Sequence, residues 1–193
     1  KNERQNESVE QINIAGKHLL YLVSEILDLS RIEAGKLPVN IDAVDVIPII
    51  NNCILSMSPN SNTKNIQLEF QNSPEQLWLM GDPIRVKQVI LNILSNAIKY
   101  GPENDTISIQ AYIQGDLATI KVHDNGDGIN EKMQEYLYTP FERSQDNEAD
   151  VEGTGVGLAI TKQLMELMEG KIEFQNLKPI GCQFALSFPK AHI

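Results

Sequence analysis

The most informative pattern of hydrophobic and polar positions lies between residues 85 and 100. On a helix of about 100° per residue, five polar side chains fall within an arc of roughly 80°, and nearly all other positions are apolar. These five are Arg85, Gln88, Asn92, Asn96 and Lys99. Asp82 can cap this helix and Gly101 can end it. The stripe is narrow and rich in amides, so it predicts a polar cavity inside a packed domain; a solvated stripe is the alternative.

A heptad repeat marks the first part of the chain. From Glu7 to about Gly35, apolar residues recur every seven positions in two series, Ile12, Leu19, Ile26 and Ala15, Leu22, Leu29. Gly35 and the nearby Pro38 favour a helix end there. A single helix cannot bury such a face alone, so residues 8–35 should pack on another helix, either from a second copy or from upstream sequence. We expect a homodimer through these residues.

Beyond Pro38, strand and helix patterns mix without strict alternation. Strands are expected at residues 39–44, 66–70, 76–80, 106–113, 117–123, 171–174 and 184–188, helices at 45–57, 85–100, 131–137 and 156–169, and polar loops at 58–65 and 145–152. This order predicts an α+β fold, a two-layer sandwich of a mixed sheet with helices on one face, preceded by a coiled-coil-like helix. The expected domains are residues 1–37 and 38–193.

Composition and charge narrow the function classes. The 193 residues are 41% hydrophobic and 22% charged, which is typical of a folded domain. The net charge of −10 argues against unspecific binding of nucleic acid. Cys53 and Cys182 have neither zinc-site spacing nor a disulfide framework.

The chain shows no secretory signal and no apolar run near the roughly 20 residues that span a bilayer. We therefore expect a cytoplasmic location. Because the chain begins at Lys1 without a methionine, we also expect it to be a fragment, and its parent protein could carry a membrane anchor.

Two glycine-rich segments could bind a flat ligand and its phosphates. Asp124-Asn125-Gly126-Asp127-Gly128-Ile129 follows a predicted strand, which would place a carboxylate beside a tight turn. An ordinary hairpin or Asx turn explains this segment equally well. Gly153-Thr154-Gly155-Val156-Gly157-Leu158 opens a helix, where backbone N–H groups can bind an anion. It has neither dinucleotide-fold nor P-loop spacing, and a flexible hinge is the alternative.

Taken together, these segments resemble the catalytic, ATP-binding domain of sensor histidine kinases of two-component systems. The same fold serves DNA gyrase, mismatch-repair ATPases and heat-shock chaperones. Asn92-x-x-x-Asn96-x-x-Lys99-Tyr100 resembles the N box, residues 124–128 the first glycine box, and residues 153–158 the second. Pro140-Phe141-Glu142-Arg143 resembles the F box. Residues 28–37 resemble the end of the second helix of the dimerisation bundle, without the acceptor helix that would precede it.

The resemblance implies a site for ATP and Mg²⁺. Asn96, with Asn92, would hold the metal ion, Lys99 would contact a phosphate, and Asp124 would accept a hydrogen bond from the adenine amine. The other nucleotide-binding residues would be Tyr100, Gly126, Gly128, Ile129, Gly153, Thr154, Gly155, Val156, Gly157 and Leu158, with residues 145–152 as a lid. Arg143 would steer the γ-phosphate or lie on the surface as an ordinary arginine. Asn92, Lys99 and Arg143 are the catalytic candidates.

The resemblance also implies the reaction. The γ-phosphoryl group of ATP would pass to a histidine upstream or in trans, and then to an aspartate of a response-regulator receiver domain, under control of an upstream sensor domain. ATP-hydrolysing relatives carry a glutamate base at the position of Asn92. An amide cannot take a proton, which favours phosphotransfer over hydrolysis. An ATPase-type switch and a nucleotide-binding module without kinase activity are the alternatives.

Two departures from the family pattern stand out. None of His18, His123 and His192 lies in a histidine-glutamate pair followed by proline, so autophosphorylation of this chain alone is not expected. Gln183 stands where the family often has a threonine that assists adenine recognition, so that contact would differ.

Overall fold

The computed structural model describes residues 2–142 and 155–192. The chain divides into two compact units, Lys1–Pro38 and Val39–Ile193. In the first unit, helix α1 (Asn2–Glu33) begins before the heptad pattern and ends near Gly35, which has a φ of +62° and donates its N–H to Ile32 O at 2.9 Å. The heptad residues Ile12 and Leu19 are 71% and 61% exposed in this single chain. Their pairing with another helix stays a prediction.

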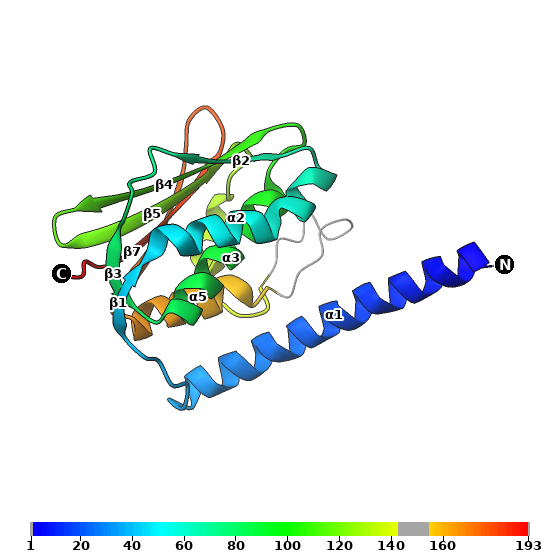
Figure 1. Cartoon of the computed structure of the whole chain (residues 1–193), viewed down its shortest axis with the longest axis horizontal. Helices are drawn as coiled ribbons and strands as arrows, with labels where there is room; N and C mark the ends of the chain where they lie inside the picture. The colour runs from blue at the N-terminus through cyan, green and yellow to red at the C-terminus, as the bar shows by residue number, and fades with distance from the viewer. Residues whose placement is uncertain (1, 143–154, 193) are drawn as a thin grey trace. The chain divides into compact units, whose positions relative to one another are not determined.

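The second unit contains a five-stranded mixed sheet with the strand order β2-β4-β5-β7-β6 (Figure 1). Its strands are β2 (Gln67–Gln71), β4 (Thr106–Gln114), β5 (Leu117–Asp124), β6 (Lys171–Asn176) and β7 (Cys182–Pro189). Strand β2 runs parallel to β4, and the other neighbours are antiparallel. A separate antiparallel pair joins β1 (Asp42–Asp45) to β3 (Trp78–Gly81).

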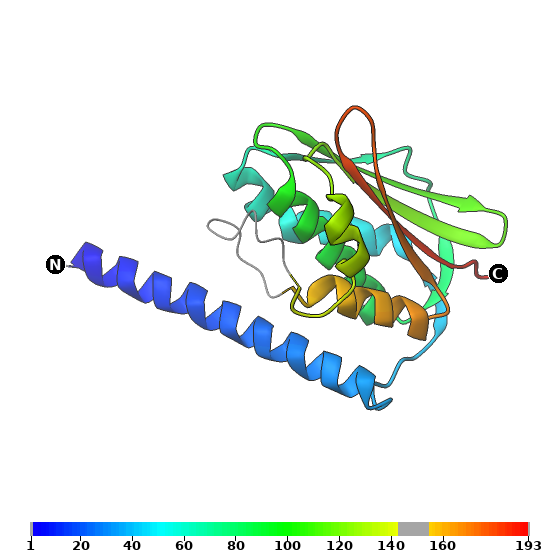
Figure 2. The ribbon, with the colours of Figure 1, turned by 180° about the vertical axis from the view of Figure 1, so that it is seen from behind.

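The helices of this unit cover one face of the sheet. Figures 1 and 2 show α2 (Val46–Thr63), α3 (Pro83–Tyr100) and α5 (Gly157–Leu167) on the same side, and the short α4 (Glu131–Tyr136) follows β5. Strands β4, β5 and β7 alternate in burial because successive side chains point to opposite faces. Their inward side chains, such as Ile109, Ile120 and Leu186, are fully buried. The predicted α+β class, with helices on one face of a mixed sheet, is confirmed.

One predicted loop is wrong, and several strand boundaries shift. Residues 58–65 were expected as a loop, but α2 continues to Thr63 through Pro59. Two serine hydroxyls in this stretch donate to backbone carbonyls of the preceding turn. Ser58 Oγ donates to Ile54 O at 2.9 Å, and Ser61 Oγ donates to Ser58 O at 3.2 Å. Ser61 is also buried, so tertiary packing overrides its weak helix propensity. Strand β1 begins at Asp42 instead of residue 39.

Candidate functional site

Helix α3 carries the predicted polar stripe. Asp82 caps it, as predicted: its Oδ1 accepts from Ile84 N at 2.9 Å and Arg85 N at 3.2 Å. Its apolar residues Val86, Val89, Ile90, Ile93, Leu94, Ala97 and Ile98 are buried. Asn92, Asn96 and Lys99 are half-buried on the remaining side. The stripe is therefore neither a solvated face nor fully enclosed.

The C-terminal end of α3 is held by a residue that the sequence analysis did not single out. Lys64, just after α2, donates from Nζ to Ile98 O at 3.0 Å and to Lys99 O at 2.7 Å. A cation at this end also complements the helix dipole. The Lys99 ammonium lies 4.9 Å from the centre of the exposed Tyr100 ring. Half-buried Lys99 thus keeps its ammonium beside this exposed ring.

The first glycine segment lies against this end of α3. Asp124, at the end of β5, is 6% exposed, and its Oδ1 accepts from Gly126 N at 3.0 Å. Burial raises the pKa of Asp124 above its usual value, although the Gly126 N–H acts in the opposite direction. A Cβ atom at Gly126 would lie 2.7 Å from Tyr100 O, so only glycine allows this approach.

Asn176 completes the first glycine segment, and no local signal marked it. From β6, its Oδ1 accepts from Ile129 N at 2.9 Å and its Nδ2 donates to Ile129 O at 2.7 Å. Gly128, with a φ of +76°, passes so close that a Cβ there would lie 2.9 Å from the same Oδ1. The Asn176 carboxamide thus holds the backbone of Ile129, just after the turn of the first glycine segment.

The second glycine segment is described only from Gly155 onward. Gly153, Thr154, Arg143 and the lid residues 145–152 lie outside the described residues. Gly155, with a φ of +69°, accepts at its O from Phe141 N at 3.0 Å, which joins the F-box segment to this glycine segment. Val156 is buried, and Leu158 is half-buried.

Helix α5 starts beside the polar stripe of α3. It begins at Gly157, where a Cβ atom would lie 2.5 Å from Asn92 Oδ1. One turn later, Thr161 Oγ1 accepts from Asn92 Nδ2 at 2.6 Å. The fold therefore brings Asn92 of the predicted N box against the second glycine segment, and Tyr100 against the first.

Cys182, not Gln183, is the cross-strand neighbour of Asp124. Gln183 pairs with His123, and alternation along a strand places this pair on the other face of the sheet. Gln183 therefore does not share a face of the sheet with Asp124. Burial, with the charge of Asp124, raises the pKa of the Cys182 thiol to about 12, so this thiol is neutral at physiological pH.

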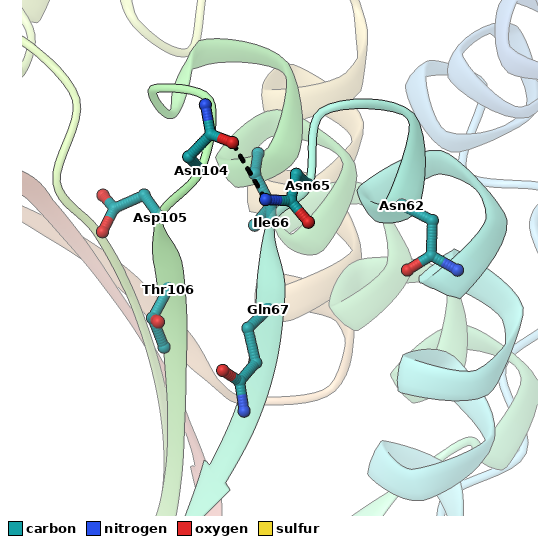
Figure 3. Close-up of a pocket in the computed structure, with 7 residues that line it drawn as sticks. All are labelled: Asn62, Asn65, Ile66, Gln67, Asn104, Asp105 and Thr106. Carbon is teal, nitrogen blue, oxygen red and sulfur yellow. Dashed lines mark hydrogen bonds between the residues drawn. The ribbon is translucent and has the colours of Figure 1, made fainter.

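A polar pocket lies near the start of β2 and β4 (Figure 3). It is lined by Asn62, Asn65, Ile66, Gln67, Asn104, Asp105 and Thr106. Asn65 Nδ2 donates to Asn104 Oδ1 at 2.9 Å across it, and Asp105 Oδ1 accepts from Asn125 Nδ2 at 3.1 Å. The Asp105 carboxylate would repel an anion, and its hydrogen bond to Asn125 links this pocket to the first glycine segment.

Among residues 2–142 and 155–192, no group of three or more His, Cys, Asp or Glu side chains could hold a metal ion. Asn92 and Asn96, the residues that the sequence resemblance implies for Mg²⁺, offer neutral amide oxygens, which suit an ion that keeps several waters. Within the same ranges, no helix has the length and apolar character needed to cross a membrane.

Comparisons with known proteins show which family the chain resembles. The sequence pattern of the histidine kinase-, DNA gyrase B- and HSP90-like ATPases matches residues 81–192. The circadian input-output histidine kinase CikA of Synechococcus elongatus is 34% identical over 97% of this chain and 25% of its own length. The non-motile and phage-resistance protein of Caulobacter vibrioides is 31% identical over 95% of this chain and 22% of its own length. The chain thus spans about a quarter of these relatives.

Solved structures share the fold. Full-length ShkA in complex with AMPPNP has a TM-score of 0.82 and 25% identity, over 98% of this chain and 40% of ShkA. The nucleotide-free catalytic domain of the histidine kinase ThkA has a TM-score of 0.69 and 27% identity, over 78% of this chain and 96% of that domain.

Proposed function

This chain belongs to the histidine kinase-, DNA gyrase B- and HSP90-like ATPase family, and on that premise we propose that it binds ATP with Mg²⁺ as the phosphotransferring core of a sensor histidine kinase. One observation carries the proposal. The amide-bearing helix α3 meets both glycine segments, through Tyr100 and Gly126 at one end and through Asn92 and Gly157 nearer its middle. Segments far apart in the sequence thus converge where a nucleotide could touch all three.

In this proposal each region has a separate task. Buried Asp124 accepts from the exocyclic amine of adenine, because an ionised carboxylate can only accept. Backbone N–H groups at the start of α5 bind phosphates, where the helix dipole favours negative charge. Asn96, with Asn92, holds Mg²⁺, which would neutralise phosphate charge. Lys99 contacts a phosphate, and Arg143 could steer the γ-phosphate.

The proposed reaction is phosphoryl transfer to a histidine upstream or in trans, followed by relay to a response-regulator aspartate. Asn92 cannot remove a proton from water, which favours transfer to an acceptor that brings its own base. A response-regulator partner is supported by the related histidine kinase ThkA, which has been solved in complex with the response regulator TrrA. Pairing through residues 8–35, an upstream sensor domain and a cytoplasmic location belong to the same proposal.

The rival proposals share the nucleotide site but differ in chemistry. An ATPase-type switch would release phosphate into water, and a binding module would retain ATP unchanged. Asn92 favours transfer over hydrolysis, because the amide that stands here is no base. The exposed apolar residues of α1 favour a helical partner over an isolated binding module.

Labelled ATP separates these functions. The chain is incubated with Mg²⁺ and ATP labelled on the γ-phosphate, with and without a separate polypeptide that carries an acceptor helix. Label on the polypeptide histidine without free phosphate supports the kinase. Steady phosphate release that survives further purification would favour the ATPase switch. ATP bound but unchanged would favour the binding module, and no binding in Mg²⁺ would reject the nucleotide site.

A further inference from the structure

Thr161 lies outside the motifs of the sequence analysis, yet its side chain touches the candidate site. It stands on α5 and is 1% exposed. Its Oγ1 accepts from Asn92 Nδ2 at 2.6 Å. Residues 157 and 161 are four apart on one helix and so share a face. Gly157 and Thr161 therefore meet the same carboxamide.

The oxygen of that carboxamide lies at Gly157. A Cβ atom there would be 2.5 Å from Asn92 Oδ1 and 3.0 Å from Nδ2, which is too close for real atoms. The missing side chain thus provides the space that the Asn92 amide occupies. Asn92 lies along the first turn of α5, with its nitrogen bound to Thr161 and its oxygen beside Gly157.

We infer that Thr161 is a positioning residue, whose hydroxyl holds the Asn92 nitrogen and keeps the Asn92 oxygen at the start of α5, where phosphates and Mg²⁺ would bind. The outer side-chain torsion of asparagine is broad, so a carboxamide without this hydrogen bond can swing away from the start of α5. The Asn92 oxygen would then no longer stand at the proposed cation site. This consequence for ATP rests on the proposed function.

The competing explanation is that Thr161 only fills space in the core. Thr119 offers a matched control, because it is 5% exposed and its Oγ1 lies 3.0 Å from Ser187 Oγ. Thr119 and Ser187 pair across β5 and β7, one residue out of phase with the inward-facing Ala118 and Phe188. Both threonines are buried and hydrogen-bonded, but only Thr161 touches Asn92.

The test compares Thr161→Val, Thr161→Ser and Thr119→Val. ATP affinity is measured with Mg²⁺ and with EDTA. We expect Thr161→Val to lose about tenfold in affinity with Mg²⁺ and to bind as the wild type does with EDTA. Thr161→Ser should restore binding, and Thr119→Val should bind normally. Wild-type affinity of Thr161→Val with Mg²⁺, an equal loss in EDTA, or failure of serine to rescue would each overturn the inference.

A second measurement does not depend on nucleotide. Urea unfolding of Asn92→Ala, Thr161→Val and the double variant forms a double-mutant cycle. We expect the double variant to lose clearly less stability than the sum of the single losses, because the second change removes no further bond. Additive losses would overturn the contact on which the inference depends. If the wild type binds no ATP but the cycle shows coupling, the proposed function fails and the contact stands.

Discussion

The carboxylate of Asp82 joins two segments, because its Oδ2 accepts from Asn40 N at 3.0 Å while its Oδ1 caps α3. Burial opposes ionisation of Asp82, but the N–H groups of Asn40, Arg85 and Ile84 outweigh it and hold the pKa of this carboxyl below its usual value. An acid with a lowered pKa stabilises the fold above its unfolded pKa and loses that contribution as the pH falls through its folded pKa.

Asp82→Asn should therefore destabilise the chain in a pH-dependent way. At pH 7 we expect a loss of about 1–3 kcal/mol in the free energy of unfolding, since the bonds to an ionised acceptor are lost. The difference from the wild type should shrink as the pH falls below about 4. Urea unfolding of the wild type and Asp82→Asn at pH values from 7 to 3 measures this difference, with Asp116→Asn, at an exposed position, as the control. A gap that stays constant down to pH 3 would show that charge plays no part.

Asp124→Asn should change nucleotide selectivity. The adenine amine can donate to the Asp124 carboxylate. Guanine presents an oxygen at that position, and the amide of asparagine can donate to it, whereas an ionised carboxylate cannot. We expect ATP affinity to fall at least tenfold and the ratio of GTP to ATP affinity to rise. The matched control is Asp127→Asn, an exposed residue of the same segment. Unchanged selectivity in calorimetric titrations would mean that Asp124 does not contact the nucleobase.

Binding of ATP by the wild type should weaken in acid. Because burial raises the pKa of Asp124, this carboxyl takes up its proton at a higher pH than an exposed aspartate would. Affinity should therefore begin to fall while the pH is still above the ordinary aspartate range near 3.9. Titrations in a pH series, with circular dichroism to confirm folding, measure this. Asp124→Asn should not show this loss of ATP affinity at low pH. If the loss persists in that variant, another group causes it.

Asn96→Ala should remove most Mg²⁺-dependent binding of ATP without unfolding the domain. The half-buried amide contributes an oxygen to the proposed cation site and lies on the polar side of α3, so its loss leaves the buried face intact. Ser95→Ala changes an exposed neighbour on the same helix and should bind normally. Wild-type affinity of Asn96→Ala in a fluorescence titration with Mg²⁺ would refute this assignment.

Asn176→Ala should loosen the first glycine segment. Two hydrogen bonds to Ile129 would be lost, so we expect the free energy of ATP binding to weaken by about 1–2 kcal/mol. The melting temperature should change little. Gln175→Ala, at the exposed neighbouring position of β6, is the control. Equal affinity of the two variants would mean that the turn needs no support from β6.

Features that depend on neighbouring residues were predictable from the sequence. Asp82 and Gly101 bound α3 as expected, because caps act within one helical turn. The periodic segments gave the right elements and the right fold class, since binary patterning follows the period of each element. The loop predicted at residues 58–65 failed because serine and asparagine favour turns in isolation, whereas packing extends α2 over them.

Features that depend on distant residues were not predictable. Lys64, Thr161 and Asn176 act on groups 34 to 69 positions away, and nothing in their local sequence distinguishes them from surface residues. The face of the sheet that carries Gln183 was not predictable for a related reason. A shift of one residue in strand register exchanges the two faces of a sheet, and only the pairing of β5 with β7 decides which residue accompanies Asp124.

Lys64 and Asp82 fix the two ends of α3 to other parts of the domain. One end of the helix is tied through Asp82 to Asn40, and the other through its terminal carbonyls to Lys64. Folding therefore orders the amides of this helix before any ligand arrives, and the entropy of fixing them need not be lost again on binding. A ligand that enters beside α3 would therefore meet amides that the fold has already placed.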